Sequence, residues 1–339
     1  MPWEDQGSES KALPEACICI LTTLSPPAPV RQPTAVALGT FDGLHAGHRR
    51  VINEARAMAA QDASQSGQPV STVVSFWPHP REVLYGETRL GLDLPEEKLA
   101  LLDPLGIQQL VLLPFTPQLA SLSPERFVAE VLIDQLAACC VAVGENFRFG
   151  VRRSGDAERL SALGLQHGIR VSVVPMLHDP AGRVSSSRVR QALAGGRISE
   201  AEALLGRPYR FEGLVQSGRG LGRQLGWPTA NLQVSGRKFL PMEGVYAAFA
   251  WTPDQLGGPP MAAVMNLGGQ PTVDPEAPSA VEVHLLDREV DLLGQSLVVQ
   301  PIRWLRAQRR FANLEELCQQ IDSDVDTARE HLMSHPWTP

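Results

Sequence analysis

Residues 36–48 read Val-Ala-Leu-Gly-Thr-Phe-Asp-Gly-Leu-His-Ala-Gly-His, an apolar run that ends at a glycine and leads into a helical pattern. Residues 34–38 have the continuous apolar character of a buried parallel strand, and residues 49–60 repeat apolar side chains at helical spacing. The N-terminus of a helix presents free backbone N–H groups and the positive end of a dipole. The turn before this helix is therefore predicted to bind a phosphate.

Two histidines stand in this turn, three residues apart. On a first helical turn this spacing puts His45 and His48 on one face, where both can point at a bound phosphate. Either histidine alone is more often a capping or surface residue. The pair favours a phosphate-transfer site, because Gly39, Gly43 and Gly47 around it let the backbone approach a ligand closely.

Composition limits the kinds of partner. The chain has 339 residues, 43% of them hydrophobic and 20% charged, which is ordinary for a globular protein with room for two domains. A formal net charge of −7 argues against a nucleic-acid partner, since such proteins usually present a basic face. The five cysteines include no Cys-x-x-Cys pair, so the sequence supports neither a disulfide framework nor a zinc site. A reducing cytoplasm is the expected location.

Residues 1–33 are predicted to form an N-terminal tail with an edge strand. The segment begins with acidic residues, and its apolar run at 17–24 lacks a basic flank. This run is far too short to span a membrane, so no membrane partner is predicted.

From residue 34 to about residue 202, predicted strands alternate with predicted helices. This is the pattern of a doubly wound parallel sheet, an α/β fold that binds ligands outside the carboxyl ends of its strands. The predicted strands are 34–38, 70–76, 107–113, 139–143 and 169–175, and later helices are predicted at 95–102, after Ser123 and at 156–167.

Three further loops belong at this edge of the sheet. Residues 76–80 read Phe-Trp-Pro-His-Pro, which ends a strand. Residues 144–150 read Gly-Glu-Asn-Phe-Arg-Phe-Gly; Asn146, Arg148 and the rings suit a heterocycle with a phosphate, and a turn with two packed phenylalanines is an equal alternative. Residues 183–190 read Arg-Val-Ser-Ser-Ser-Arg-Val-Arg at the start of a helix, a second anion site, where a serine cap alone leaves the arginines unexplained.

In this order, the four motifs resemble the adenylyltransferase part of bacterial bifunctional riboflavin kinase/FAD synthetases, within the nucleotidyltransferase superfamily. The resemblance implies that AMP is transferred from ATP to the phosphate of FMN, with release of pyrophosphate. It implies that His45 and His48 are catalytic and that Asn146 and Arg148 bind the flavin. The nucleotide would be bound by Gly39, Thr40, Phe41, Asp42, Gly43, Arg183, Ser186, Ser187 and Arg190.

A second domain is predicted from residue 203 to residue 335, after a first domain at 34–202. Ser199 and Glu202 have the spacing of a capping box for a helix that ends near Leu205. Beyond it, short β-type runs separated by glycine and proline predict a small antiparallel barrel, closed by a helix that Asn313 caps. The predicted strands are 209–215, 244–252, 260–266, 280–286 and 296–302.

A glycine-dense loop at 213–231 differs from a Walker loop and ends in Pro-Thr-Ala-Asn. Its glycines would expose backbone N–H groups to a phosphate, and the hydroxyl and amide oxygens at its end are hard ligands that Mg²⁺ accepts. A flexible hairpin is the usual explanation of such glycines, but Pro-Thr-Ala-Asn resembles the flavokinase signature. The nucleotide would be bound by Gly218, Gly222, Arg223, Thr229 and Asn231, and the metal by Thr229 and Asn231.

The two resemblances together cover about residues 34–332 and imply an enzyme that uses riboflavin, FMN, ATP and Mg²⁺ to form FAD. Strand alternation sets Glu282 and His284 on one face, and Glu282 is the expected base for the riboflavin hydroxyl; a structural hydrogen bond is its alternative role. Val273, Arg288 and Leu293 stand where the family pattern has aromatic residues, which predicts weaker riboflavin binding.

Two other functions fit parts of the pattern. One is a nucleotidyltransferase for a different phosphate acceptor with a degenerate barrel, against which the flavin motifs of both halves argue. The other is a flavin-binding storage or regulatory module without turnover, against which His45, His48 and Glu282 argue. The oligomeric state is left open.

Overall fold

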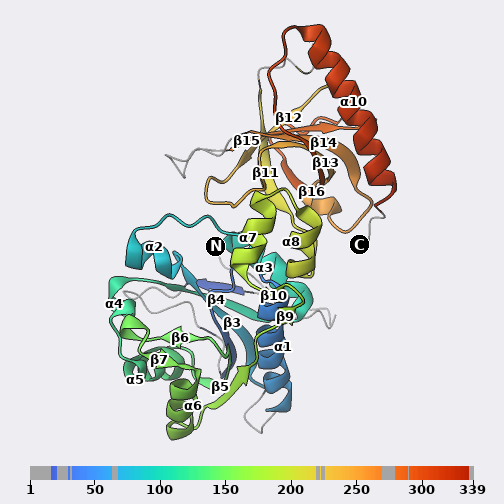
Figure 1. The fold of residues 1–339 in the computed structure, drawn as a ribbon. Coiled ribbons are helices and arrows are strands. Elements are labelled where there is room, and N and C mark those ends of the chain that lie inside the picture. The colour runs from blue at the N-terminus through green and yellow to red at the C-terminus, as the bar shows by residue number, and fades with distance from the viewer. Residues whose placement is uncertain are drawn as a thin grey trace, which may run out of the picture. The chain divides into compact units, whose positions relative to one another are not determined.

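The computed structural model describes residues 17–20, 30, 33–62, 68–218, 222, 226–268, 279–288 and 290–335. The chain forms two compact units, and each unit consists of several chain segments. Unit 1 comprises Met1–Thr40, Val51–Pro80 and Leu99–Val174. Unit 2 comprises Phe41–Arg50, Arg81–Lys98 and Pro175–Pro339. Figure 1 shows the ribbon coloured along the chain.

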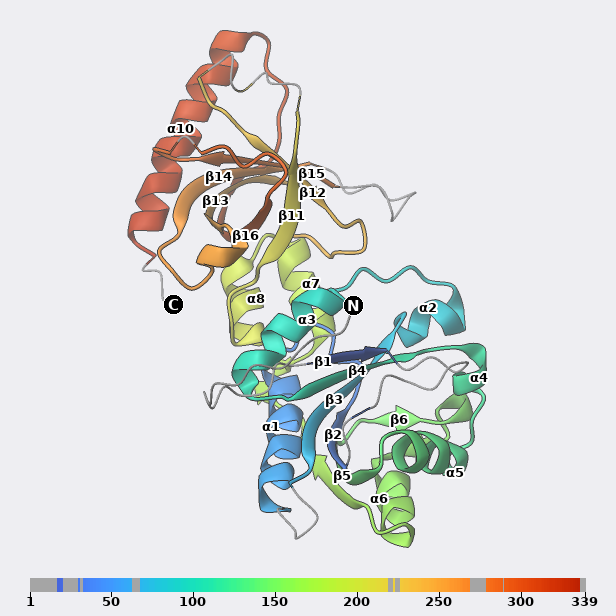
Figure 2. The same ribbon diagram turned by 180° about the vertical axis from the view of Figure 1, so that it is seen from behind.

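Unit 1 contains a six-stranded sheet in the order β1-β4-β3-β2-β5-β8, and every neighbouring pair is parallel (Figure 2). Its strands are β1 (Cys17–Ile20), β2 (Thr34–Leu38), β3 (Val70–Trp77), β4 (Gln109–Pro114), β5 (Ala138–Gly144) and β8 (Arg170–Val174). The strand order reverses between β2 and β5, and doubly wound sheets bind ligands at such a switch point. The predicted parallel sheet is confirmed.

Helices cover both faces of this sheet. All five residues of β2 are buried, as in a strand covered on both faces. Figures 1 and 2 show α1 (Ala46–Gln61) on the side of the sheet opposite to α5 (Pro124–Arg126) and α6 (Ala157–Gln166). The other elements are η1 (Asp103–Leu105), α4 (Pro117–Ala120), the π-helix η2 (Phe127–Gln135), β6 (Arg148–Phe149), η3 (Val151–Arg153) and β7 (Gly155–Asp156); α2 (Pro80–Tyr85) and α3 (Pro95–Leu102) have residues in both units.

Unit 2 contains a closed antiparallel barrel in the order β11-β12-β15-β14-β13-β16, which confirms the prediction of a barrel. Its strands are β11 (Phe211–Gln216), β12 (Ala230–Val234), β13 (Gly244–Trp251), β14 (Met261–Leu267), β15 (Ser279–Leu285) and β16 (Ser296–Arg306). Unit 2 also contains β9 (His178–Asp179), β10 (Gly182–Arg183), α7 (Ser186–Ala194), α8 (Ile198–Leu205), η4 (Pro253–Gln255) and α10 (Leu314–Met333).

Strand β13 is buried at all eight positions because two apolar clusters share it. Tyr246 and Ala248 belong to the cluster inside the barrel, to which α7 and α8 also contribute. Phe249 and Trp251 face the other way and pack with α10, which lies along the outside of the barrel in Figure 1. The predicted cap of α10 is confirmed, since Asn313 Oδ1 accepts from a backbone N–H of the first turn at 2.8 Å.

Two local predictions were wrong. Helix α8 begins at Ile198 after Arg197, and no side chain caps it. Ser199 lies inside the first turn because the buried Ile198 fixes where the helix starts, and the Glu202 carboxylate accepts from Tyr209 N–H instead. Strand β12 was not predicted, and its first two residues were placed in the glycine-dense loop; it is short and alternates polar with buried residues.

Buried ion pairs explain why unit 2 includes residues 81–98. Lys238 is 1% exposed, and its Nζ donates to Leu92 O at 2.8 Å and to Glu97 Oε2 at 2.6 Å. Arg207 Nη2 lies 3.3 Å from Asp93 Oδ1. Charges leave water only when they are paired, so these contacts attach the segment to the C-terminal half of the sequence. The predicted division at residue 202 stays a prediction.

Candidate active sites

The first candidate site begins at the carboxyl end of β2, beside the switch point. Gly39 N–H donates to Val74 O of β3 at 3.1 Å, and the Ser75 hydroxyl donates to Thr40 O at 2.8 Å. The neighbouring strand therefore holds the start of the loop. Gly39 and Thr40 lie where the prediction of a nucleotide site needs them, at the edge where doubly wound sheets bind ligands.

The loop that follows turns sharply before α1. Phe41 and Leu44 have φ values of 43° and 44°, a region that residues other than glycine rarely occupy and that recurs at functional sites. Gly43 has a φ of 90°, and a Cβ there would lie 2.7 Å from Leu92 Cδ1. Both the conformation and the space at this position therefore require glycine.

His45 and His48 lie side by side at the start of α1. Their rings stack with centroids 3.6 Å apart, and His45 Nδ1 accepts a hydrogen bond from the His48 backbone N–H at 3.2 Å. Because Nδ1 is the acceptor, a neutral His45 carries its proton on Nε2. Nδ1 of His48 is buried and has no hydrogen-bond partner among the residues that the structure describes. Both rings thus retain a nitrogen for a ligand.

Both imidazoles are uncharged at neutral pH. Burial lowers the pKa of His45 to about 4, although the Asp42 carboxylate opposes this shift. Burial also lowers the pKa of His48 well below its usual value, with contributions from His45 and Lys98. A neutral imidazole keeps one N–H donor, so the pair can donate hydrogen bonds to a phosphate without charging the loop.

Asp42 clamps the same loop. Its carboxylate accepts from Leu92 N–H at 2.9 Å and from Arg190 Nη2 at 2.6 Å, while Ser186 Oγ donates to its backbone carbonyl at 2.8 Å. Burial alone would raise the pKa of Asp42, but Arg190, Lys98 and the Leu92 N–H outweigh burial and hold it below its usual value. The structure thus joins Asp42, Ser186 and Arg190 to one another, and Arg190 Nη1 is buried without a hydrogen-bond partner among the described residues.

Helix α7 begins with the hydroxyl groups and arginines that the sequence predicted at the start of a helix, and it belongs to unit 2. Ser185, which the prediction of site residues left out, is the N-cap and accepts from Arg188 N–H. Ser187 is exposed in the first turn, and Arg183 is exposed just before it, with Nη1 3.6 Å from Met176 Sδ. The N-terminus of α7 therefore carries accessible donors for an anion.

The loop that follows β5 belongs to unit 1. Asn146 is exposed, and Arg148 Nη1 lies 2.7 Å from Asp156 Oδ2. Phe149 is buried, and its ring stacks on that of Phe147 with centroids 5.6 Å apart. The aromatic rings thus follow the alternative of a packed turn, while the assignment of Asn146 and Arg148 to the flavin stays a prediction.

The second candidate site crosses three strands of the barrel. Glu282 on β15 pairs in register with Asn231 on β12 and with Asn266 on β14. Glu282 is exposed while its neighbours Val281 and Val283 are buried, so the predicted alternation is confirmed. A carboxylate and two amides therefore form one polar row on the outside of the barrel.

Two glycines adjoin this row. A Cβ at Gly218 would lie 2.1 Å from Asn231 Nδ2, and a Cβ at Gly222 would lie 2.4 Å from Trp227 O and 3.3 Å from Thr229 Oγ1. Both glycines therefore leave room beside the two residues predicted to hold Mg²⁺. Arg223 and Val273 lie outside the described residues, and Arg288 and Leu293 are exposed.

Besides Ser185, two residues near the candidate sites were missing from the predicted site residues. Asn266 is the first residue of Asn-Leu-Gly-Gly-Gln-Pro-Thr at 266–272, a run that the resemblance to the flavokinase includes, and this run was the available signal. Lys98 is buried, and its Nζ donates to Phe41 O at 2.8 Å. Its contact joins residues 57 positions apart, which no local pattern reveals.

Comparison with known proteins decides the family. Residues 28–188 match the FAD synthetase family model, and residues 205–332 match the riboflavin kinase family model. A bifunctional riboflavin kinase/FMN adenylyltransferase of Pseudomonas fluorescens is 37% identical over 301 residues, which cover 89% of this chain and 94% of that protein. The protein of the same name from Escherichia coli K12 is 36% identical over 296 residues, covering 87% and 91%. The chain belongs to this family.

One solved structure shares the fold of this chain over most of the length of both proteins. It is titled as a macrolide-efflux protein from Streptococcus pneumoniae and is 29% identical, with a TM-score of 0.76 over 91% of this chain and 96% of that one. Among the described residues of this chain, no helix has the length and apolar character needed to cross a membrane. The resemblance drawn from the motifs is confirmed at the level of the family.

Proposed function

We propose that the chain phosphorylates riboflavin with ATP to form FMN, and then transfers AMP from a second ATP to FMN, forming FAD and pyrophosphate. The observation that carries this proposal is the presence of two differently built candidate sites in one member of the family. One has paired imidazoles at a helix N-terminus, and the other has a carboxylate between two amides on a barrel.

In the kinase reaction, Glu282 would accept the proton of the riboflavin hydroxyl that attacks the γ-phosphate of ATP. An alcohol is a poor nucleophile, so a positioned base is needed. The hydroxyl of Thr229 and the amide oxygen of Asn231 would hold Mg²⁺, which neutralises phosphate charge when bound. Gly218, Gly222 and Arg223 would bind the nucleotide.

In the adenylyl transfer, the attacking phosphate of FMN is already ionised, so no base is needed. The chain has only to align two phosphates and stabilise the charge that develops at the α-phosphate of ATP. His45 Nε2–H and the ring of His48 would donate to these oxygens. The other nucleotide ligands would be Gly39, Thr40, Phe41, Asp42, Gly43, Arg183, Ser186, Ser187 and Arg190, with Asn146 and Arg148 at the flavin.

We assign the adenylyl transfer to residues 34–202 and the kinase reaction to residues 203–335, with residues 1–33 as a tail. The ranges of the two family models support this division. A cytoplasmic location is supported by the free thiols of the described cysteines Cys139, Cys140 and Cys318.

A time course with purified full-length chain tests the function. The chain is incubated with riboflavin, ATP and Mg²⁺, and the flavins are resolved by chromatography. We expect FMN to appear first and FAD to follow. Turnover of pantetheine phosphate or glycerol phosphate in place of FMN would instead indicate another acceptor, and flavin binding without turnover would indicate a storage module.

A further inference from the structure

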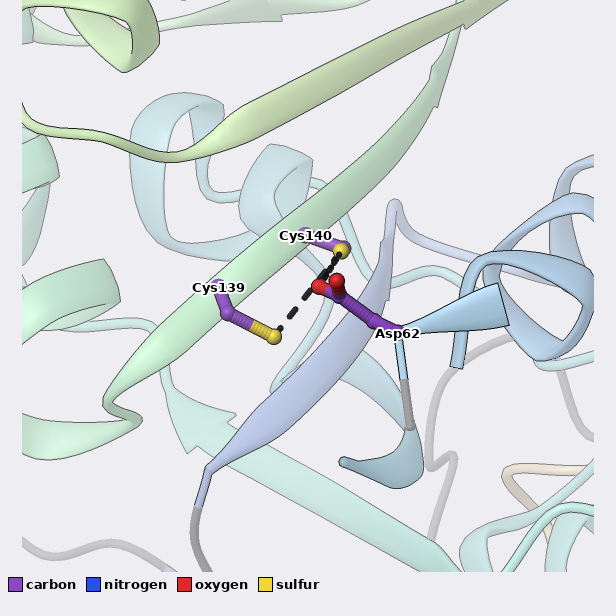
Figure 3. A group of neighbouring side chains, drawn as sticks. All are labelled: Asp62, Cys139 and Cys140. Carbon is purple, nitrogen blue, oxygen red and sulfur yellow. Dashed lines mark hydrogen bonds between the residues drawn. The ribbon is translucent and has the colours of Figure 1, made fainter. Parts of the chain in front are cut away.

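A cluster of three metal-ligand side chains lies in unit 1, at the amino edge of the sheet. Cys139 and Cys140 begin β5, and Asp62 directly follows α1. Figure 3 shows the three side chains converging from the strand and the end of the helix. Their ligand atoms all lie within 4.8 Å of one another. Neither proposed reaction uses them, since the carboxyl ends of the strands lie at the opposite edge.

Two of the three spacings between these atoms are close to those around a tetrahedral metal ion. Two sulfur ligands about 2.3 Å from a tetrahedral Zn²⁺ lie about 3.8 Å apart, and a sulfur and a carboxylate oxygen lie about 3.6 Å apart. In this chain the two Sγ atoms are 3.8 Å apart, and Cys140 Sγ lies 3.3 Å from Asp62 Oδ2. We propose that Cys139, Cys140 and Asp62 bind one thiophilic divalent cation of the Zn²⁺ class.

Binding exchanges protons for the metal. Burial raises the pKa of Cys139 to about 12, with a further contribution from Cys140, and burial also raises the pKa of Cys140. Both thiols are therefore protonated before the ion arrives. On binding, two S–H bonds break, two metal–sulfur bonds form and two protons leave to the solvent. The Asp62 carboxylate supplies the third ligand and water the fourth.

The positively charged guanidinium of Arg170 lies beside two of these ligands. Its Nη2 lies 3.1 Å from Cys140 Sγ and 3.4 Å from Asp62 Oδ2. Half of its side chain is exposed, so the guanidinium can turn into the solvent when a divalent ion replaces its charge. Arg170 therefore competes with the metal, and its removal strengthens binding.

The sequence did not predict this site because its ligands have no motif spacing. Adjacent cysteines differ from a Cys-x-x-Cys pair, and the carboxylate stands 78 residues before Cys140. Only the parallel sheet and its crossover helix bring these ligands together.

Titration with Co²⁺, which takes the same tetrahedral thiolate sites and absorbs visible light there, tests the proposal. Reduced full-length chain is titrated with Co²⁺ alone under a phosphine reductant. We expect one equivalent to give the intense band of a tetrahedral thiolate site. Zn²⁺ should displace the Co²⁺ and remove the band.

Variants assign the ligands. Cys139→Ser and Cys140→Ser should each abolish the band, and Asp62→Asn should weaken binding about tenfold or more, since even outer-shell changes cost 10- to 100-fold. Cys318→Ser, which removes a cysteine on α10, is the matched control and should bind as the parent does. Arg170→Gln should bind more tightly, an increase that a purely structural role of the cluster does not produce.

The proposal fails if Co²⁺ gives only a weak octahedral spectrum, or if the tetrahedral band survives in both cysteine variants. It also fails if Cys318→Ser abolishes the band, or if Arg170→Gln does not raise the affinity. Circular dichroism of each variant distinguishes a lost ligand from a lost fold. For a variant that does not fold, mass spectrometry of parent chain alkylated with and without Zn²⁺ decides, because a bound ion must protect both cysteines.

Discussion

The loop before α1 and the polar row on the barrel are the two candidate phosphate sites, and they are built in opposite ways. In the loop, Asp42 and His45 are no more than 7% exposed, and ion pairs and backbone hydrogen bonds fix the chain. On the barrel, Thr229 and Glu282 are exposed on strands whose inner residues form the core. One site is rigid and buried, and the other is open.

The difference follows the chemistry that each site is proposed to perform. The adenylyl transfer joins two phosphates and needs fixed donors, and buried neutral imidazoles offer N–H groups that need no rearrangement. The kinase reaction needs a group that takes a proton from the hydroxyl and later returns it to water, and an exposed carboxylate is in contact with that water. Burial therefore suits the site without a base, and exposure suits the site with one.

The largest effect is expected at Glu282. Glu282→Gln keeps the size of the side chain but cannot accept a proton, so riboflavin phosphorylation should fall by about 10²- to 10⁴-fold. Conversion of supplied FMN to FAD should stay near the parent rate, which separates the two sites in one variant. If both rates fell together with the melting temperature, Glu282 would be structural and the kinase base would lie elsewhere.

The next largest effect tests how firmly residues 81–98 are held. Lys238→Met leaves the Glu97 carboxylate without its buried partner, and breaking such a pair typically costs about 3–5 kcal/mol. We expect the free energy of unfolding of unit 2 to fall by about 3 kcal/mol in denaturant titrations.

A matched control for this change is Arg126→Met. Arg126 pairs with Glu130 on the surface of unit 1, where 64% and 42% of the two side chains are exposed. An exposed pair is worth about 0–1 kcal/mol, so this variant should change stability little. If Lys238→Met and Arg126→Met lowered the free energy of unfolding equally, burial would not make the Lys238–Glu97 pair stronger than an exposed pair.

An effect of similar size is expected at His48. His48→Ala removes one donor at the helix N-terminus, and a comparable donor is worth about 10²- to 10³-fold in rate. FAD formation should fall by that factor while FMN accumulates, as chromatography of a riboflavin time course would show. Unchanged FAD synthesis would remove His48 from the mechanism.

Local patterns predicted the elements of this fold but not the contacts that join distant segments. Thr34–Leu38 and α10 were predictable because burial on both faces gives a continuous apolar run, and Asn313 caps its own helix. The alternation that places Glu282 outside the barrel is equally local. The start of α8 was mispredicted because burial of Ile198 overrides the capping pattern at Ser199.

The candidate sites show the same limit. The spacing of His45 and His48 was enough to bring their rings together, since one helical turn holds both. The partners of Asp42 stand 50 and 148 residues away, so only the folded chain reveals that this carboxylate clamps the loop. Asp42, Ser186 and Arg190, which were predicted to bind the nucleotide, thus also form hydrogen bonds with one another.

The smallest effect concerns pH and separates the buried site from the open one. The pKa of His45 is about 4 in the folded chain, against 6.5 for a histidine side chain in water, so the unfolded chain binds more protons between these values. Stability gained from a neutral His45 is therefore present above about pH 6.5 and is lost as the pH falls toward 4. Lowering the pH from 7 to 5 should cost about 2 kcal/mol through this group.

His45→Gln tests this assignment, because glutamine fills much of the same space but does not titrate. Denaturant unfolding at pH 7 and pH 5 without nucleotide should show a smaller loss of stability for His45→Gln than for the parent. Asp42 does not confuse the comparison, since its pKa lies below 3.8 and its contribution changes at lower pH. If the parent and His45→Gln lost equal stability, His45 would already be solvated in the folded chain, and the contrast between a buried and an open phosphate site would not hold for this histidine.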